Sequence, residues 1–558
     1  MTLLILLGCR DRDGGDTALA WEPELHCPGD PNADCDDNDG QLRAGASSVS
    51  LVPPCFESWA DVDGDGEWSK TTDGWLDCGC DQVCPEDEGW TVADEGEADG
   101  VFQATWLAGF SNGRPAQGVA DGVWARTLVL RQGETAMAII SVDLVGFMHD
   151  DVLRVRQEAA DRGLDIDHIL VSSTHTHEGP DTVGLWGERI GKSGYQPEYV
   201  QWVREQMLAG IEEALEDERE VATSTLGGVD VREYHPERGS ANVIRDTRDP
   251  VVLPYELGVL HLADSSGETI ATVVHWGCHP ETLASDNLLI SSDFVHYLRT
   301  TVESGSAWDA YSREGVGGTA IYLQGMVGGM MTTLRLTTET PDGDDLSGAT
   351  WEHTEAVGVL LGEMALDAIE QGEAISPSLS FEHSEFKLPV MNIGFQAMFT
   401  IGVITRELYD YDPEATIDDD NRPRVLTDMD HISLGDLELL SMPGELFPEA
   451  ALGGYDGSLT GSDLYDIVTE GNENPPDLDL APEGPYIADG MSAPNKWIVG
   501  LGNDELGYII PSFNFELHER SPYLDEAEGD HYEETNSLGP DTEALVSEQA
   551  DRLLSWSP

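Results

Sequence analysis

Apolar residues recur along the chain in short runs of strand length, and these runs alternate with segments of helical periodicity. From about residue 97 onward, the apolar runs predict strands at Ala136–Val145, His168–Ser173, Tyr255–Leu262, Thr269–Trp276, Ala320–Leu323, Leu437–Met442 and Trp497–Leu501. Amphipathic spacing predicts helices at Asp151–Arg162, Glu198–Glu216 and Thr354–Gln371. Strands that alternate with helices are typical of an α/β fold, here with mixed sheets.

The N-terminal part of the chain lacks this alternation. Residues 27–92 are rich in Asp, Gly and Cys and have little helical or strand periodicity, which predicts a small, acidic, loop-rich module. Residues 1–26 are interpreted as an export signal followed by a polar tether. The α/β domain then spans 97–558, and its Pro-, Gly- and Asp-rich stretch 456–489 is expected to be a long surface insertion.

Cysteines are concentrated in the N-terminal module. The six residues concerned are Cys27, Cys35, Cys55, Cys78, Cys80 and Cys84. In an acidic, loop-rich segment this spacing predicts a disulfide framework and therefore an oxidising compartment. A zinc site built from Cys78, Cys80 and Cys84 is the alternative. Cys278 stands alone far downstream and is expected to be a small core residue.

The same module places aspartates at alternate positions. Asp61, Asp63 and Asp65 precede Gly66, as in an EF-hand-type loop whose carboxylates bind Ca²⁺. Thr72 occupies the twelfth position, where such loops carry Glu. A second acidic run, residues 34–40, resembles the acidic loops of some bacterial surface proteins. Calcium binding in this module is the hypothesis, and solvated turns without an ion are the alternative.

The chain begins with a short apolar run that ends at Cys9. The sequence Leu-Leu-Gly-Cys resembles a bacterial lipobox, which predicts an exported protein that is lipidated at Cys9. The run lacks the basic residues of a signal peptide, so a coincidental apolar start is the alternative. No stretch reaches the roughly 18 uninterrupted apolar residues of a spanning helix. Membrane contact is therefore expected through the anchor and not through a transmembrane helix.

The net charge of the chain limits the classes of molecule that it is expected to bind. The chain has 107 acidic and 28 basic residues, for a formal net charge of −79 at pH 7. Such a field repels phosphate backbones, so nucleic acid is not expected as a partner. A solvated, salt-tolerant or calcium-rich surface is the simplest interpretation, and recognition of a basic partner is the alternative.

Four short segments place metal-capable side chains just after an apolar run. His175 and His177 follow the first of these runs, and side chains two apart in extended backbone share a face. The other segments carry, in chain order, His275, Cys278, His279, Glu445 and Tyr508. Ligands gather at the carboxyl ends of strands in α/β folds, and imidazole nitrogen and carboxylate oxygen suit zinc. Each segment alone is weak evidence, and their order and context give them weight.

Taken together, these segments resemble the neutral, non-lysosomal ceramidase family. The matches are Thr-His-Thr-His-Glu-Gly-Pro with the family's THTHSGP, Leu-Ile-Ser-Ser-Asp with its LISGD, and Pro-Gly-Glu with its PGEF. Gly-Leu-Gly-Asn…Gly-Tyr, followed by Tyr-Glu…Leu-Gly-Pro, completes a series that runs in a consistent order from about residue 97 to 545. The resemblance implies a ceramidase-like catalytic domain that hydrolyses the C–N amide bond of N-acylsphingosine or a related lipid amide with zinc-activated water.

Carried over by position, the resemblance implies zinc ligands at His175, His279, Glu445 and Tyr508. His279 is preferred over His275 because it stands eleven residues before Ile290, which is the family's spacing. The resemblance also implies that His177 handles a proton beside the metal and that Asp293 orients a ligand or the substrate. Because a Tyr ligand is unusual for zinc, Tyr508 stabilising the oxyanion is the alternative.

The sequence departs from the family in one segment. Where the family has Gly-Asp-Val-Ser-Pro-Asn, this chain has Gly329 in place of the aspartate and Met331 in place of a serine implicated in cleaving the amide. Methionine cannot donate a proton or act as a hydroxyl nucleophile. Two alternatives therefore stand beside amide hydrolysis: an esterase of the same fold, and a zinc-containing cell-surface binding protein that has lost catalysis.

Overall fold

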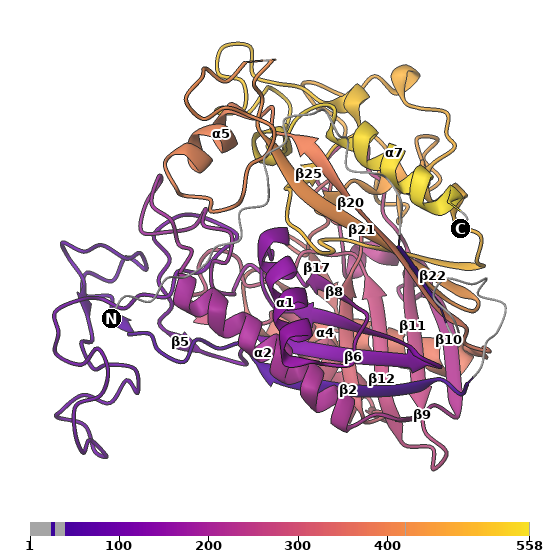
Figure 1. The fold of residues 1–558 in the computed structure, drawn as a ribbon, viewed down its shortest axis with the longest axis horizontal. Helices are drawn as coiled ribbons and strands as arrows, with labels where there is room; N and C mark the ends of the chain where they lie inside the picture. Colours follow the sequence, from indigo (N-terminus) through magenta and orange to yellow (C-terminus); the bar gives the residue numbers. More distant parts are fainter. Residues whose placement is uncertain (1–23, 28–39, 419, 557–558) are drawn as a thin grey trace.

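Three five-stranded sheets form the centre of the molecule (Figure 1). The structure is a computed structural model, and it describes residues 24–27, 40–418 and 420–556. The first sheet has the order β8 (His168–Ser173), β7 (Thr135–Val142), β6 (Trp124–Gln132), β2 (Arg43–Ser50), β9 (Arg219–Glu220). The second has the order β16 (Thr319–Gln324), β12 (Thr269–Trp276), β11 (Glu256–Ala263), β10 (Thr223–Asp230), β19 (Glu373–Ala374). The third has the order β1 (Glu24–His26), β20 (Leu379–Pro389), β21 (Arg424–Leu434), β22 (Leu437–Ser441), β24 (Asn495–Val499).

Each of the three sheets contains a single parallel pair of strands. The parallel pairs are β7–β8, β12–β16 and β22–β24, and the other neighbours are antiparallel. The carboxyl ends of these pairs are joined by hydrogen bonds: the Asn503 amide donates to the Val171 carbonyl at 2.7 Å, and the Gly500 amide donates to the Gln324 carbonyl at 2.9 Å. The three pairs therefore meet at one place, and the prediction of an α/β fold with mixed sheets is confirmed.

Helices cover the outer faces of the sheets (Figure 1). α1 (His149–Arg162) and α2 (Pro197–Glu216) pack beside the first sheet, and α3 (Phe294–Ser304) and α4 (Trp351–Gln371) pack on the second. α7 (Thr542–Ser555) packs on the third sheet. The remaining α-helices of the described chain are short: α5 (Ile393–Thr400), α6 (Pro448–Leu452).

The central core lies where the three sheets face one another. It contains, among others, Leu128 from β6, Leu260 from β11 and Phe381 from β20. β7 shows how one strand serves two cores, because Met137 and Ile139 point into the central core while alternate residues face α1 and α2. A strand that is buried on both faces reads as a continuous apolar run, which explains why the sequence identified β7.

Ten short strands complete the described part of the chain. They are β3 (Trp59–Ala60), β4 (Gly74–Trp75), β5 (Gly118–Val119), β13 (Leu289–Ile290), β14 (Gly305–Ala307), β15 (Ser312–Glu314), β17 (Thr337–Glu339), β18 (Asp345–Ser347), β23 (Glu445–Leu446), β25 (Tyr508–Ile509). Between 456 and 489 the structure has no strand or α-helix, in line with the predicted surface insertion.

The expected boundary between an N-terminal module and the α/β domain needs a correction. β2 lies inside the predicted module 27–92, yet it pairs along its whole length with β6 in the first sheet. The strand consists mostly of small and polar residues, Arg-Ala-Gly-Ala-Ser-Ser-Val-Ser, so its apolar signal is weak. Its long-range pairing with β6 determines its position in the sheet. The part of the module that contains β2 therefore belongs to the large domain.

Disulfides form within the cysteine-rich segment, as predicted. Cys55 pairs with Cys80, and Cys78 pairs with Cys84, which rules out the alternative of a zinc site at Cys78, Cys80 and Cys84. Disulfides of this kind are typical of an exported protein. Cys9, Cys35, the predicted tether up to residue 23 and the acidic run up to residue 39 lie outside the described residues.

No helix in the described part of the chain is long and apolar enough to cross a membrane.

Candidate metal centre and pocket

The predicted site residues come in the sequence after strands of the three parallel pairs, whose carboxyl ends meet at one place. His175 comes two residues after β8, and His279 comes three residues after β12. Glu445 begins β23 and Tyr508 begins β25, and these two residues are direct partners in a parallel ladder. Strand pairing thus places Glu445 beside Tyr508, although the two residues are 63 positions apart in the sequence.

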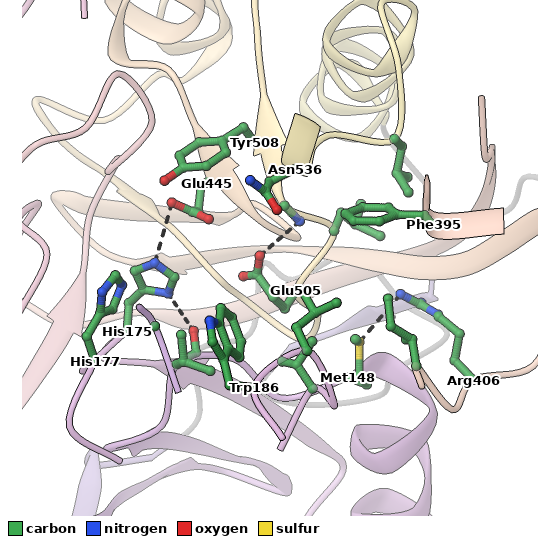
Figure 2. A pocket seen from close by; sticks show the side chains of 18 of the residues that line it. Met148, His175, His177, Trp186, Phe395, Arg406, Glu445, Glu505, Tyr508 and Asn536 are labelled. Carbon is green, nitrogen blue, oxygen red and sulfur yellow. Dashed lines mark hydrogen bonds and ion pairs between the residues drawn. The ribbon is translucent and has the colours of Figure 1, made fainter. Parts of the chain in front are cut away.

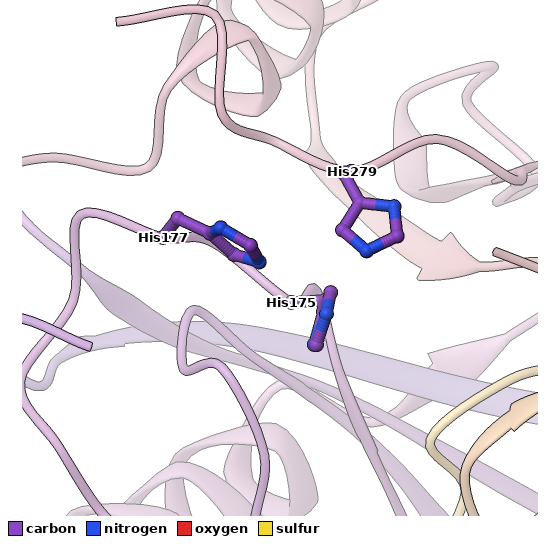
Figure 3. A group of neighbouring side chains, drawn as sticks. All are labelled: His175, His177 and His279. Carbon is purple, nitrogen blue, oxygen red and sulfur yellow. The ribbon is translucent and has the colours of Figure 1, made fainter. Parts of the chain in front are cut away.

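His175, His279 and Glu445 converge on one point. The Oε2 atom of Glu445 lies 3.4 Å from Nε2 of His175 and 3.2 Å from Nε2 of His279. The two imidazole rings have their centroids 4.7 Å apart and are nearly perpendicular (Figure 3). All three side chains are buried. This convergence is the geometry that the sequence predicted for a metal site.

The backbone fixes the orientation of both rings. Nδ1 of His279 donates to the Met331 carbonyl at 2.8 Å, and Nδ1 of His175 donates to the Val145 carbonyl. A carbonyl only accepts hydrogen bonds, so the proton of each neutral ring sits on Nδ1 and the lone pair on Nε2 points at the common centre. Rings of metal-binding histidines are held in this way.

Charge pairing keeps Glu445 ready to act as a ligand. Burial disfavours a charged carboxylate, but the neighbouring His175 and His279 outweigh burial and lower the pKa of Glu445. Burial likewise opposes protonation of His175, and Glu445 overcomes it and raises the pKa of that ring. The centre therefore holds an ionised carboxylate, which suits a bound cation.

His177 lies beside this centre. Its ring centroid is 5.0 Å from that of His175 and 5.4 Å from that of His279, and the three rings form a buried group that could hold a metal ion (Figure 3). Nδ1 of His177 is 3.2 Å from Oε2 of Glu281, close enough for an ion pair but not aligned for a hydrogen bond. Burial lowers the pKa of His177 to about 4.

Two neighbours hold His177 and Glu281 in place. Gly109 has φ of +98°, and a Cβ there would lie 2.3 Å from Cγ of His177, so only glycine allows the chain to pass this close to the ring. Glu281 accepts a hydrogen bond from the Thr332 hydroxyl at 2.5 Å. Burial alone would raise the pKa of Glu281, but His177, His279 and Thr332 lower it overall.

Tyr508 lies against Glu445 (Figure 2). Its hydroxyl donates to the sulfur of Met330 at 3.0 Å. Burial, followed by the charge of Glu445, raises the pKa of Tyr508 well above its usual value, so the phenol keeps its proton. Met330 has φ of +61°, a left-handed conformation that is uncommon for a residue with a side chain.

Met331 and Cys278 do not face the centre. The Met331 side chain packs in the core between the second sheet and its helices, and only its carbonyl reaches the site, through His279. Cys278 is the free cysteine of the described chain and is buried in the same core, as expected for a small core residue. Of these two adjacent methionines, Met330 is the one whose side chain reaches Tyr508.

Asp293 lies outside the pocket. One of its oxygens accepts from the Phe294 amide at 2.7 Å and caps α3, and the other accepts from the Leu283 amide at 3.0 Å. Burial raises the pKa of Asp293 to about 6. The carboxylate therefore holds the loop that carries Glu281 onto α3 and touches no pocket residue through these bonds, which limits the predicted orienting role to an indirect one.

An apolar pocket opens beside His175, His177, Glu445 and Tyr508 (Figure 2). Its apolar walls come from several elements: Val145, Met148, Val183, Leu185, Trp186, Phe395, Phe399, Ile404, Leu506, Leu538. His279 and Asp293 are not among the lining residues. Pockets of small-molecule sites combine apolar walls with a few polar groups in this way.

Glu505 is a pocket residue that the sequence analysis did not single out. Its Oε1 accepts from the Gly507 amide at 2.9 Å, while Oε2 is buried without a hydrogen-bond partner. Burial, followed by the charge of Glu445, raises its pKa well above the usual value. With His175 and Glu445 it forms a second group of potential ligand atoms, all within 4.8 Å of one another. No sequence signal marks an orphaned oxygen of this kind.

The aspartates of the predicted calcium loop also come together. Asp61, Asp63 and Asp65 each offer an oxygen within 4.8 Å of the others, on the surface of the molecule. The Asp61 carboxylate already accepts from the amides of Gly64 and Gly66 at 2.7 and 3.0 Å. Calcium binding at this loop stays a prediction.

Known structures share this fold. No protein-family model matches the chain. The neutral ceramidase from Pseudomonas aeruginosa is similar, with a TM-score of 0.59 and 14% sequence identity over 92% of this chain and 74% of that one. A ceramidase complexed with C2 has the same TM-score and identity, over 92% of this chain and 75% of that one. The similarity shows that the chain has a divergent ceramidase-like fold.

Proposed function

We propose that this protein is a zinc-dependent hydrolase that cleaves a C–N amide bond in a lipid amide, with N-acylsphingosine as the first candidate substrate. The observation that carries the proposal is the convergence of His175, His279 and Glu445 at the edge of an apolar pocket. The ceramidase-like fold supports the choice of bond and substrate class.

The donor set fits zinc. Ligand atoms about 2.0–2.1 Å from a tetrahedral zinc ion lie about 3.3 Å from one another. The two nitrogen–oxygen separations here are 3.4 and 3.2 Å, so the side chains need little movement to bind the ion. His175, His279 and Glu445 would hold it. A Tyr508 that coordinates the ion as a fourth protein ligand is the alternative to a Tyr508 that keeps its proton and donates a hydrogen bond. When bound, zinc supplies Lewis-acid polarisation of a carbonyl and lowers the pKa of water toward neutrality.

The surrounding residues supply the proton handling. Hydrolysis adds one water across the amide: the hydroxyl goes to the carbonyl carbon, the C–N bond breaks, and a proton goes to the leaving nitrogen. His177 stands beside the centre and can accept the proton from water and pass it to the amine. Tyr508 keeps its phenolic proton, so it can donate a hydrogen bond to the developing oxyanion in place of Met330.

The pocket favours a substrate with an alkyl chain. Phe395, Phe399 and Leu538 form apolar walls beyond the polar end at His175 and Glu445. An acyl chain laid on these walls would be removed from water, with a gain of about 0.8 kcal/mol for each buried CH₂ group. Exclusion of water also strengthens the electrostatic interactions at the polar end.

A location outside the cytoplasm and at a membrane would be consistent with a lipid-amide substrate. The disulfides indicate an exported protein. We propose that lipidation at Cys9 anchors it to a membrane, as the Leu-Leu-Gly-Cys sequence predicts. Incorporation of labelled palmitate into the chain, and its loss in Cys9→Ser, tests this anchor separately from the activity.

The test of the function combines elemental analysis of the purified protein with release of fatty acid from N-acylsphingosine, with and without chelator. We expect stoichiometric zinc and release that stops on chelation and returns with zinc. Release from an ester analogue but not from the amide would favour the esterase alternative. A protein that holds no zinc after reconstitution would contradict the proposal.

A binding role without catalysis is the second candidate. It is favoured by the sulfur of Met330 at the Tyr508 hydroxyl and by Met331 at the position of the family serine. In that case zinc is stoichiometric, the lipid amide binds in the pocket, and neither amide nor ester is cleaved. Isothermal calorimetry with the intact substrate distinguishes this outcome from an empty pocket.

A further inference from the structure

α5 has two different apolar faces. Phe395 and Phe399 line the pocket, while Ile393 is 44% exposed and Ile401, just after the helix, is 61% exposed. In Figure 1 this helix projects from the body of the molecule, away from the three sheets. The wall of the pocket is therefore at the same time part of the outer surface.

Two loops add further exposed apolar side chains beside α5. Ile190 is 82% exposed and Leu524 is 62% exposed. The loop of Ile190 is bound next to Ile401, because the Ser193 hydroxyl donates to the Val403 carbonyl at 2.7 Å. Leu524 lies at the other end of the helix, where its Cδ2 is 3.6 Å from the Cβ position of Gly394. We call Ile190, Ile393, Ile401 and Leu524 the rim patch.

Charge beside α5 and Ile190 differs from that of the whole chain. The whole chain carries 107 acidic and 28 basic residues, yet no charged residue occurs from Leu388 to Thr405. Ile190 stands between two exposed basic residues: Arg189, which is 66% exposed and only loosely paired with Glu188 at 3.7 Å, and Lys192. Aliphatic side chains with basic neighbours are the composition of segments that enter the interface of a bilayer.

We propose that the rim patch docks onto the surface of a phospholipid bilayer with zwitterionic phosphatidylcholine headgroups. The isoleucines and Leu524 would enter the boundary between headgroups and acyl chains, and Arg189 and Lys192 would contact phosphates. α5 has only eight residues, so it would lie on the bilayer. The purpose of this contact rests on the proposed function, because a lipid amide would then reach the pocket from the bilayer.

A bilayer fits this surface better than the other occupants. A second copy of the chain would bring together two molecules that each carry a net charge of −79, which opposes association. The same charge opposes strongly anionic membranes at long range and favours a neutral headgroup surface. Exposed Asp525 and Glu526 follow Leu524, but the uncharged stretch 388–405 and the basic Arg189 and Lys192 reduce this repulsion over the rest of the rim patch.

The test measures co-sedimentation of the full chain with phosphatidylcholine vesicles, with Cys9→Ser in every sample so that lipidation does not contribute. The variant Ile190→Ser/Ile401→Ser removes two exposed side chains of the rim patch. The matched control Leu464→Ser/Leu480→Ser removes two that are 62% and 65% exposed elsewhere. We expect the rim variant to bind about tenfold or more weakly and the control to bind as the parent does.

Equal binding of the rim variant and the parent, or no binding of the parent to these vesicles, would overturn the proposal. Loss of self-association in the rim variant, seen by sedimentation velocity without vesicles, would assign the patch to a second copy and overturn it as well. Chelator-treated protein is included, because vesicle binding needs no turnover. Failure of the zinc hypothesis would leave binding intact, and failure of docking would leave cleavage of a short-chain soluble substrate unchanged.

Discussion

The buried centre at Glu445 and the surface loop at Asp61 both bring together three side chains that could hold a cation, and they differ in what surrounds each ligand atom. At the centre, backbone carbonyls aim His175 and His279, and burial excludes water. In the loop, the Asp61 carboxylate is bound by its own backbone amides and faces solvent. Proximity is common to both, but only the centre is preorganised, so tight binding is expected there and weak binding in the loop.

The strongest test of this difference removes one ligand from the centre. We expect His279→Ala to weaken zinc binding by at least about 1,000-fold, beyond the 10- to 100-fold that changes outside the ligand set cost. The measurement is zinc retained after dialysis against a competing chelator.

His275→Gln is the matched control for this change. His275 belongs to the same segment, but its ring stacks on Trp497 and bonds the Ile498 carbonyl, away from the centre. Full zinc retention in His279→Ala, or loss in a folded His275→Gln, would show that the wrong histidine was assigned.

A second test concerns a buried carboxylate that has no part in metal binding. Glu534 accepts from Arg248 at 2.8 Å and from His531 at 2.7 Å. Although burial opposes it, these partners lower the pKa of Glu534 to about 2. A lowered pKa stabilises the fold above the unfolded-state value of about 4.3, and this contribution, about 3 kcal/mol, is lost as the pH falls from about 4.5 to 2.

We therefore expect Glu534→Gln to be less stable than the parent at pH 7 and to lose less of its free energy of unfolding below pH 4.5. Denaturant unfolding at several pH values measures both effects. Glu526→Gln, an exposed change in the same region, controls for the loss of one negative charge. Parallel pH profiles for parent and Glu534→Gln would contradict the interpretation.

The strands that could be predicted from the sequence carry a local apolar signal, and the strands that could not depend on contacts between distant elements. β8 and β12 have the predicted bounds, because each contains a short apolar run and is buried along its whole length. β21 was missed, since Asp428 and Asp430 interrupt its apolar pattern; both are buried and are paired with Arg156 and His168 from other elements. Such pairs are invisible until the sheets are assembled.

The candidate ligands of the centre could be predicted because local sequence motifs contain them. Its candidate ligands stand in short motifs whose order resembles the ceramidase family, so His175, His279 and Glu445 could be named from the sequence. Glu505 could not, because its importance comes from an oxygen left without a partner in the folded pocket. The contact of Met330 with the Tyr508 hydroxyl also depends on a left-handed backbone conformation, φ of +61°, which no sequence motif predicts.

A smaller effect is expected from Glu505, measured in metal-free protein. Its unpartnered oxygen is buried beside the charge of Glu445, and such a group costs stability. We expect Glu505→Gln to raise the free energy of unfolding by about 1 kcal/mol. Glu281→Gln is the contrast, because the buried Glu281 is bonded by Thr332 and paired with His177, so its loss should destabilise the protein. Effects of the same sign would contradict the distinction.

The smallest effect is expected from calcium at the surface loop. Extracellular calcium modules bind with dissociation constants of about 0.1–1 mM, so 10 mM calcium would add roughly 1–3 kcal/mol at a single such site. Because Asp61 is occupied by backbone amides, the lower end applies, and we expect the melting temperature of the full chain to rise by only about 1–2 °C. Asp63→Asn should abolish this rise and leave zinc retention unchanged, whereas a calcium response that survives in Asp63→Asn would place the ion elsewhere and leave the loop as solvated turns.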